Sequence, residues 1–220
     1  MMTSFLRTEI AAAKHITPAE VDLHIIDWQS PLILSDLKSC DSCEQTRYDV
    51  WAHCNKEQFK ISSTTPLIIV DYEKVVADYY VRKKKPKHCD FVISGDIADG
   101  HKRIALCDLT CQKEKLVNNP APSIKYPAGK REYAWTQMGD TVTRWQTKAS
   151  YAAMIGQYAE KIFIFGWRDS DVPKTTQDQA NKAMTDFNLS TTAATAGPVS
   201  FGRRGDFELI QIKYPTTYNW

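Results

Sequence analysis

Residues 89–115 read CDFVISGDIADGHKRIALCDLTCQKEK, and this stretch determines how the chain is expected to fold. Two runs rich in apolar and β-branched residues, near 90–94 and 103–111, flank an Asp-Gly turn, which is typical of a β-hairpin. Asp90 stands at the head of the first run and Asp108 lies inside the second. The stretch therefore predicts a hairpin with one acid on each strand.

The length of the hairpin loop decides whether the two acids meet. A three-residue loop, 98–100, pairs residue 97 with 101 and therefore Asp90 with Asp108, whereas a two-residue loop pairs 91 with 108. Gly100 would be the last residue of the three-residue loop, where a left-handed conformation is needed. The sequence therefore favours the register in which the two carboxylates share one face.

Two carboxylates among apolar strand residues are costly to bury unless positive charge lies between them. A divalent cation is one solution, because carboxylate oxygens suit Mg²⁺ or Mn²⁺. The alternative is that each acid caps a turn or pairs with a lysine of the basic run 82–85. Both interpretations stay open at this point.

The composition fits one α/β domain spanning 1–220, because 43% of the residues are hydrophobic and 25% are charged. A net charge of +2 gives no field over the whole protein that would attract nucleic acid or a membrane, so a surface for DNA or RNA has to be local. No apolar run reaches membrane-spanning length, and the first residues lack the apolar core of a signal peptide. A cytoplasmic protein without a membrane partner is the resulting expectation.

The cysteines near position 40 suggest a second possible metal site. Cys40 and Cys43 form a C-x-x-C pair, and His53 and Cys54 follow, which are ligand types that Zn²⁺ accepts. The second pair of the usual motif is missing, since His53 and Cys54 are adjacent. A structural zinc held by Cys40, Cys43 and Cys54 is therefore a hypothesis beside ordinary free thiols.

Periodicity along the chain predicts helices and strands in alternation. Ala134, Met138, Val142 and Trp145 fall at helical spacing and predict a helix over about 130–146. Further helices are expected at 4–15, from 71 to 80 and around 178–187, and strands at 21–28, 31–38, 66–70, 161–167 and 207–215, the last at an edge. The order predicts a central mixed sheet flanked by helices, with strand 161–167 parallel to 103–111 through the helical crossover.

This order resembles the core of the PD-(D/E)xK nuclease superfamily, over about residues 66–168. The first family acid corresponds to Asp90 in HCDFVI, and the (D/E)-x-K motif to Asp108-Leu109-Thr110 in ALCDLTC. The resemblance implies a restriction-endonuclease-like core in which these two acids hold Mg²⁺ or Mn²⁺. It also implies a polar residue on the crossover helix, Gln137, and an acid on the preceding helix, for which Glu73 is better placed than Asp78.

The chain departs from the family at the motif lysine, where it has Thr110. Threonine cannot supply the positive charge that helps to activate the attacking water. Lys130, at the start of the crossover helix, is the preferred substitute, and Lys148, Lys113 and Lys115 are the others.

The resemblance implies a metal-dependent nuclease, a hydrolase of phosphodiester bonds, or a catalytically degenerate relative. The alternative is a non-enzymatic binding or assembly protein that keeps the fold, with or without the zinc at the cysteines. Phosphate contacts with DNA or RNA would come from basic residues, namely Lys83, Lys84, Lys85, Lys87, Arg203 and Arg204. The aromatic residues Trp135, Trp145, Phe163 and Phe165 have core spacing and are not expected to stack on bases.

Overall fold

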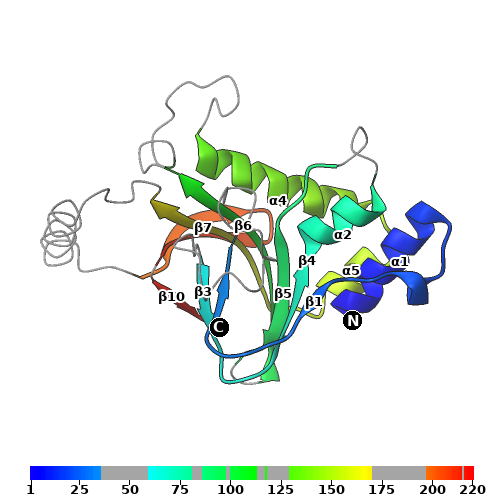
Figure 1. Ribbon diagram of the computed structural model, residues 1–220, viewed down its shortest axis with the longest axis horizontal. Helices are drawn as coiled ribbons and strands as arrows, with labels where there is room; N and C mark the ends of the chain where they lie inside the picture. The colour runs from blue at the N-terminus through cyan, green and yellow to red at the C-terminus, as the bar shows by residue number, and fades with distance from the viewer. Residues whose placement is uncertain are drawn as a thin grey trace, which may run out of the picture.

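The computed structural model describes residues 1–35, 59–80, 86–97, 100–112, 117, 129–169, 197–214 and 216–220. This part of the chain is an α/β protein with a seven-stranded mixed sheet, a three-stranded sheet and four α-helices (Figure 1). The predicted class, α/β with a central mixed sheet, is confirmed. The helix predicted around 178–187 and the cysteines at 40, 43 and 54 lie outside the described residues.

The large sheet combines an antiparallel and a parallel half. In order across the sheet its strands are β1 (Ile25–Ile26), β4 (Leu67–Asp71), β5 (Phe91–Asp96), β6 (Lys102–Gln112), β7 (Glu160–Asp169), β9 (Phe207–Lys213) and β8 (Val199–Arg204). Strands β1, β4, β5 and β6 pair antiparallel, β6, β7 and β9 pair parallel, and β8 runs antiparallel to β9. The predicted hairpin and the predicted parallel pairing of its second strand with 161–167 are both confirmed.

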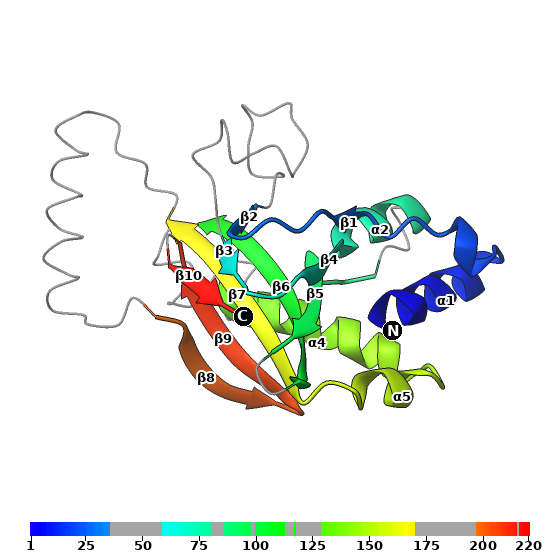
Figure 2. The same cartoon turned by 90° about the horizontal axis from the view of Figure 1, so that it is seen from below.

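The prediction that 207–215 forms an edge strand is wrong. Strand β9 lies between β7 and β8, and β8 is the edge (Figure 2). The β8 sequence VSFGRR is exposed at all six positions and contains a register shift between Ser200 and Arg203. A strand that buries neither face shows no alternation of apolar and polar residues, so the pattern that predicts half-buried strands does not detect it.

The helices cover one face of the large sheet, as Figure 1 shows. They are α1 (Met2–Lys14), α2 (Tyr72–Tyr79), α4 (Lys130–Gln146) and α5 (Tyr151–Ile155), with a short 3₁₀ helix at Pro18–Glu20. Helix α4 has the predicted bounds, and all four residues of its predicted apolar face are buried. It begins after Gly129, whose φ of 89° is a conformation that favours glycine.

Two hydrophobic cores form on the two faces of the sheet because side chains alternate along each strand. One core packs α1, α2, α4 and α5 on the sheet and contains Trp135, Trp145, Phe163 and Phe165, so the prediction that these aromatic residues are core residues is confirmed. The other core lies under the small sheet, whose strands in order are β10 (Thr217–Asn219), β3 (Phe59–Ser62) and β2 (Leu32–Leu34).

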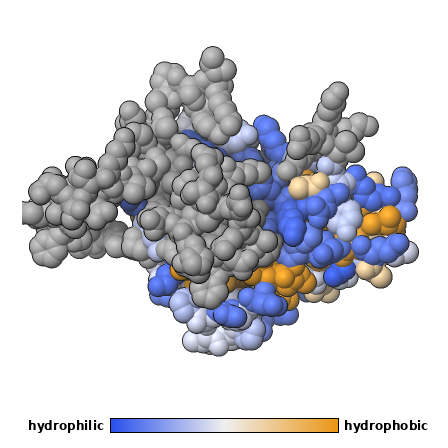
Figure 3. Space-filling model, viewed as in Figure 1, coloured by the Kyte–Doolittle hydropathy of each residue, from blue (hydrophilic) through white to orange (hydrophobic). Residues whose placement is uncertain are grey.

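None of the helices in the described ranges is long and apolar enough to cross a membrane. Hydrophilic residues cover much of the coloured part of the face in Figure 3, with smaller hydrophobic areas among them.

Candidate active site

The hairpin of β5 and β6 has the register that the sequence predicts. Phe91 pairs with Cys107 and Asp96 with Lys102, and the amide of Ile97 donates to the carbonyl of His101 at 2.8 Å. Gly100 has a φ of 72°, the left-handed conformation expected of the last loop residue. This register places residue 90 opposite Asp108, whose side chain is only 2% exposed.

Asp90 lies just before β5 and is held by main-chain groups of β6. Its carboxylate oxygen Oδ2 accepts a hydrogen bond from the amide of Leu109 at 2.7 Å, and its own amide donates to the carbonyl of Cys107 at 2.9 Å. The strict alternation of β5 therefore does not extend to Asp90, and the carboxylate lies against the amide of the residue that follows Asp108. This hydrogen bond fixes the Asp90 carboxylate at the β6 backbone, one residue after Asp108 in the chain.

The pKa values of two thiols next to the acids are raised by the charges of both acids. Burial raises the pKa of the Cys89 thiol well above its usual range, and the charges of Asp90 and Asp108 raise it further. Burial also raises the pKa of the Cys107 thiol, with smaller contributions from Cys89 and from the same two acids. Each thiol precedes one of the acids in the chain, as a Cys-Asp dipeptide.

Helix α4 fixes the segment that leads into Asp90. The side-chain amide of Gln137 donates to the carbonyl of His88 at 3.2 Å. The hydroxyl of Thr141 accepts from the amide of Cys89 at 3.1 Å and donates to the carbonyl of Gln137 at 3.0 Å. Arg144 donates to the carbonyl of Lys87 at 3.0 Å. Gln137 therefore contacts the backbone two residues from Asp90, and sequence reasoning missed Thr141 and Arg144.

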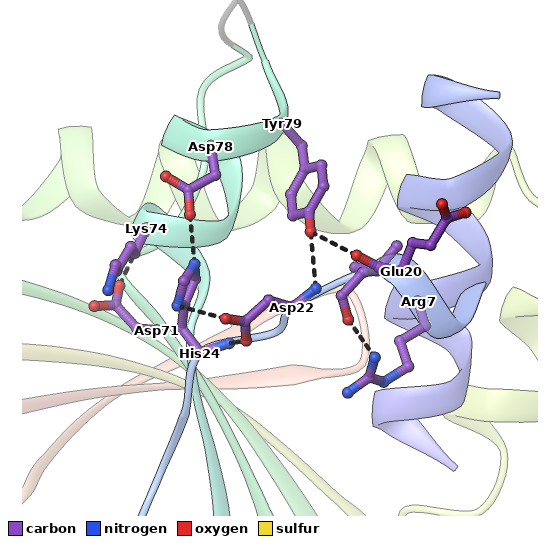
Figure 4. A network of polar contacts seen from close by, with 9 residues as sticks. Arg7, Glu20, Asp22, His24, Asp71, Lys74, Asp78 and Tyr79 are labelled. Carbon is purple, nitrogen blue, oxygen red and sulfur yellow. Dashed lines mark hydrogen bonds and ion pairs between the residues drawn. The ribbon is translucent and has the colours of Figure 1, made fainter. Parts of the chain in front are cut away.

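Of the two acids on α2, Glu73 is the one near Asp90. Glu73 is buried, with 6% exposed, and its amide donates to the carbonyl of Asp90 at 3.0 Å. Asp78 instead binds the Nε2 atom of His24, on the segment between α1 and β1 (Figure 4). Asp78 is therefore part of a separate polar network.

The same network is shown as a whole in Figure 4, where His24 lies between two carboxylates. The Nδ1 atom of His24 is 3.4 Å from a carboxylate oxygen of Asp22. The hydroxyl of Tyr79 accepts from the amide of Asp22 at 2.8 Å and donates to the carbonyl of Glu20 at 3.2 Å. These contacts tie α2 to the chain segment that precedes β1, which gives the network a structural role.

The candidate lysines that the structure describes, Lys130 and Lys148, lie at opposite ends of α4. Lys130 lies seven residues before Gln137, two turns along α4, so both project from the same side of the helix. Its Nζ atom lies 5.4 Å from the centroid of the Tyr133 ring. Lys148 forms an ion pair with Glu9 of α1 at 3.1 Å, at the other end of α4, and does not reach the acids. Lys113 and Lys115 lie outside the described residues.

Thr110, at the motif-lysine position, is 3% exposed and pairs with Trp167 of β7. Of the basic residues expected to bind phosphate, Lys87 lies 3.7 Å from a carboxylate oxygen of Asp140, and 83–85 lie outside the described residues.

Within the described ranges, no three or more His, Cys, Asp or Glu side chains are grouped so that they could hold a metal ion.

No protein-family model, no curated protein and no solved structure matches this chain. A functional hypothesis therefore has to rest on the residues of the site.

Proposed function

We propose that the chain is a metal-dependent hydrolase of phosphodiester bonds in DNA or RNA, with a core of the PD-(D/E)xK kind. One observation carries the proposal. The Asp90 carboxylate is hydrogen-bonded to the amide of Leu109, next to Asp108, at the end of the hairpin covered by α4. Two acids, one just before β5 and one on β6, are the donor set that the chemistry requires.

The donor set suits Mg²⁺ or Mn²⁺ better than a metal that needs a full protein cage. Mg²⁺ keeps several water ligands and is usually bound by one or two carboxylates together with substrate phosphates. Asp90 and Asp108 would supply these carboxylates, so the lack of a three-residue cluster in the described part of the chain does not conflict with this ion. A bound ion would polarise the scissile phosphate and lower the pKa of the attacking water.

Protein side chains would supply the remaining functions. Gln137 and Thr141 hold the backbone of residues 88–89, so the Asp90 carboxylate keeps its position relative to β6. Lys130 is the proposed substitute for the missing motif lysine, because it projects from the same side of α4 as Gln137. Its charge would stabilise the phosphate or help to orient the water.

Cleavage assays on single-stranded DNA, duplex DNA and RNA test the proposal. Cleavage should require Mg²⁺ or Mn²⁺, stop with EDTA and be lost in Asp108→Asn. Asp96→Asn is a matched control, because Asp96 is an exposed acid at the other end of β5. Lys130→Ala should slow cleavage by about a hundredfold, the lower range for loss of a proton-transfer group. Cleavage that persists in Asp108→Asn would refute the assignment.

The second candidate is a binding protein that has the same fold and no activity. The observation in its favour is that Thr110 stands buried in place of the motif lysine, while Lys148 and Lys87 are paired elsewhere. A wild-type protein that binds nucleic acid and cleaves none of the three substrates with either metal would establish this alternative.

A further inference from the structure

The side of α4 that faces β8 and β9 carries a stack of basic and aromatic side chains. We call this surface the outer flank, and it lies on the opposite side of α4 from Gln137. The guanidinium of Arg131 lies 4.2 Å from the centroid of the Phe201 ring and 5.1 Å from that of Trp135. Its NH1 group donates to Oε1 of Gln211 on β9 at 3.3 Å. The stack therefore joins the start of α4 to both outer strands of the sheet.

A second cation extends this surface along β9. Lys213 lies two residues after Gln211 and thus on the same face of the sheet. Its Nζ atom is 4.9 Å from the centroid of the Trp167 ring, on the neighbouring strand. The outer flank thus presents two cations, each over an aromatic ring.

Polar atoms of the outer flank lack partners in the described structure. The indole nitrogens of Trp135 and Trp167 and the Nε atom of Arg131 are buried and make no hydrogen bond there. Buried donors normally have a protein or water partner, so these three atoms are polar groups that ordered water would complete.

The flank also exposes an aromatic ring to solvent. Phe201 is 40% exposed on β8, and Val199 on the same strand is 45% exposed, so this strand holds two of the five exposed large hydrophobic residues in the described ranges. Arg131 and Trp135 contact the Phe201 ring, and the exposed remainder of the ring is available to a flat ligand. Exposed apolar groups beside cations are typical of binding surfaces.

A cavity of about 330 Å³ opens farther along the same flank, between α4 and the turn that joins β8 to β9. Thr136, Gly139 and Asp140 line it from the helix, Arg204 lines it from the end of β8, and Asp206 lines it from the turn. Its volume is in the range of small-ligand sites and is enough for a nucleobase. The two carboxylates would repel a phosphate, whereas carboxylate and guanidinium groups both form hydrogen bonds with base edges.

We propose that the outer flank of α4 binds single-stranded nucleic acid, with phosphates on Arg131 and Lys213, one base against Phe201 and one unpaired base in the cavity. A basic groove with exposed aromatic rings is how proteins bind single strands, because each base has a face that stacks. The choice of nucleic acid as the polyanion rests on the proposed function. The surface itself does not use Asp90 or Asp108, so binding and cleavage can be tested separately.

The first test measures binding of a fluorescein-labelled 12-nucleotide DNA strand in EDTA, by anisotropy at several salt concentrations. Lys213→Gln and Arg131→Gln should each lower the slope of log affinity against log salt by about 0.7, the value for one phosphate contact on a single strand. Lys102→Gln is the charge-matched control. Lys102 is exposed at the start of β6, whereas Lys213 lies level with the other end of that strand. Equal slopes in Lys213→Gln and Lys102→Gln would overturn the proposal. Both lysines are exposed, so neither substitution should disturb folding, and circular dichroism checks this.

The second test concerns the bases. Phe201→Leu keeps an apolar residue but removes the ring, and it should weaken binding at least about fivefold, the loss expected for one stacked base. Gly139→Leu should fill the cavity and have a similar effect, because the space at Gly139 opens toward Arg204 across the cavity. Unchanged binding in both Phe201→Leu and Gly139→Leu would refute base recognition.

Competition by unlabelled polyanions tests whether the outer flank prefers single strands, and cleavage assays separate the binding surface from the nuclease site. Unlabelled single strand should displace the probe at lower concentration than duplex DNA or polyglutamate, and equal competition by either would reduce the flank to a general polyanion surface and overturn the proposal. Binding in EDTA that depends on Lys213 and Phe201, without cleavage by the metal-loaded protein, would support the outer flank and refute the nuclease. Metal-dependent cleavage that is lost in Asp108→Asn and unchanged in Lys213→Gln and Phe201→Leu would support the nuclease and refute the outer flank as a binding surface.

Discussion

Replacing Asp90 should separate its structural role from its role in binding a metal. Its Oδ2 atom accepts the amide hydrogen of Leu109 at 2.7 Å, and Leu109 is only 1% exposed. Asp90→Ala leaves that buried donor without its acceptor, which costs about 2 kcal/mol of unfolding free energy. For a chain of this length, the loss corresponds to a Tm lower by roughly 4–8 °C. Asp90→Asn keeps an acceptor oxygen of the same shape and should lose about 1 kcal/mol or less, because a neutral acceptor is weaker than a charged one.

Urea denaturation of the three proteins checks the stability difference, with equal m-values as the condition for comparing them. Mg²⁺-dependent cleavage should be lost in both variants, because neither residue supplies a carboxylate at position 90. The reasoning is refuted if Asp90→Ala unfolds at the wild-type urea concentration, or if Asp90→Asn loses as much stability as Asp90→Ala. In either case the Leu109 hydrogen bond would not be what positions residue 90.

Three further substitutions should change stability in known directions, each measured by urea denaturation. Gly139→Ala should stabilise the protein by about 0.5–1 kcal/mol, because alanine favours a helix interior and its Cβ meets only the Arg204 side chain at 3.6 Å or more. Thr141→Val should destabilise it by about 1–3 kcal/mol, because the buried amide of Cys89 loses its acceptor. Burial raises the pKa of Tyr218 from 10.0 to about 12, so the neutral phenol stabilises the fold by roughly 3 kcal/mol below pH 10, and this contribution is lost as the pH rises to about 12. The wild type should therefore lose stability more steeply over that pH range than Tyr218→Phe, and parallel curves would contradict the assignment.

The hairpin and the crossover helix could be predicted because local rules determine them. A glycine at the last position of a three-residue loop fixed the register, and Gly100 has the left-handed φ of 72° that this loop needs. The apolar spacing of α4 gave both of its ends, since its buried face follows a helical period from Ala134 to Trp145. Parallel pairing of β6 with β7 then followed from the helical crossover between them.

The small sheet and the outer strand could not be predicted in this way. Strand β10 has three residues and pairs with β3, which lies more than 150 residues earlier in the chain, so no local pattern connects them. Strand β8 is exposed throughout and has no alternation to detect. The pairing of Lys148 with Glu9 likewise depends on how α1 packs near the end of α4, and periodicity along one segment contains no information on it.

At the site, the sequence predicted the register that sets residue 90 opposite Asp108, but not how Asp90 is held there. Alternation along β5 would have pointed Asp90 toward the helices, and Cys89 toward the small sheet. Cys89 instead packs in the helix-side core, because the chain bends at Asp90 and the Thr141 hydroxyl accepts the Cys89 amide. The bend turns the Asp90 carboxylate to the Leu109 amide, beside Asp108. The position of the Asp90 carboxylate therefore depends on α4 as well as on the hairpin, and a substitution at Thr141 should disturb the site although that residue is part of neither strand.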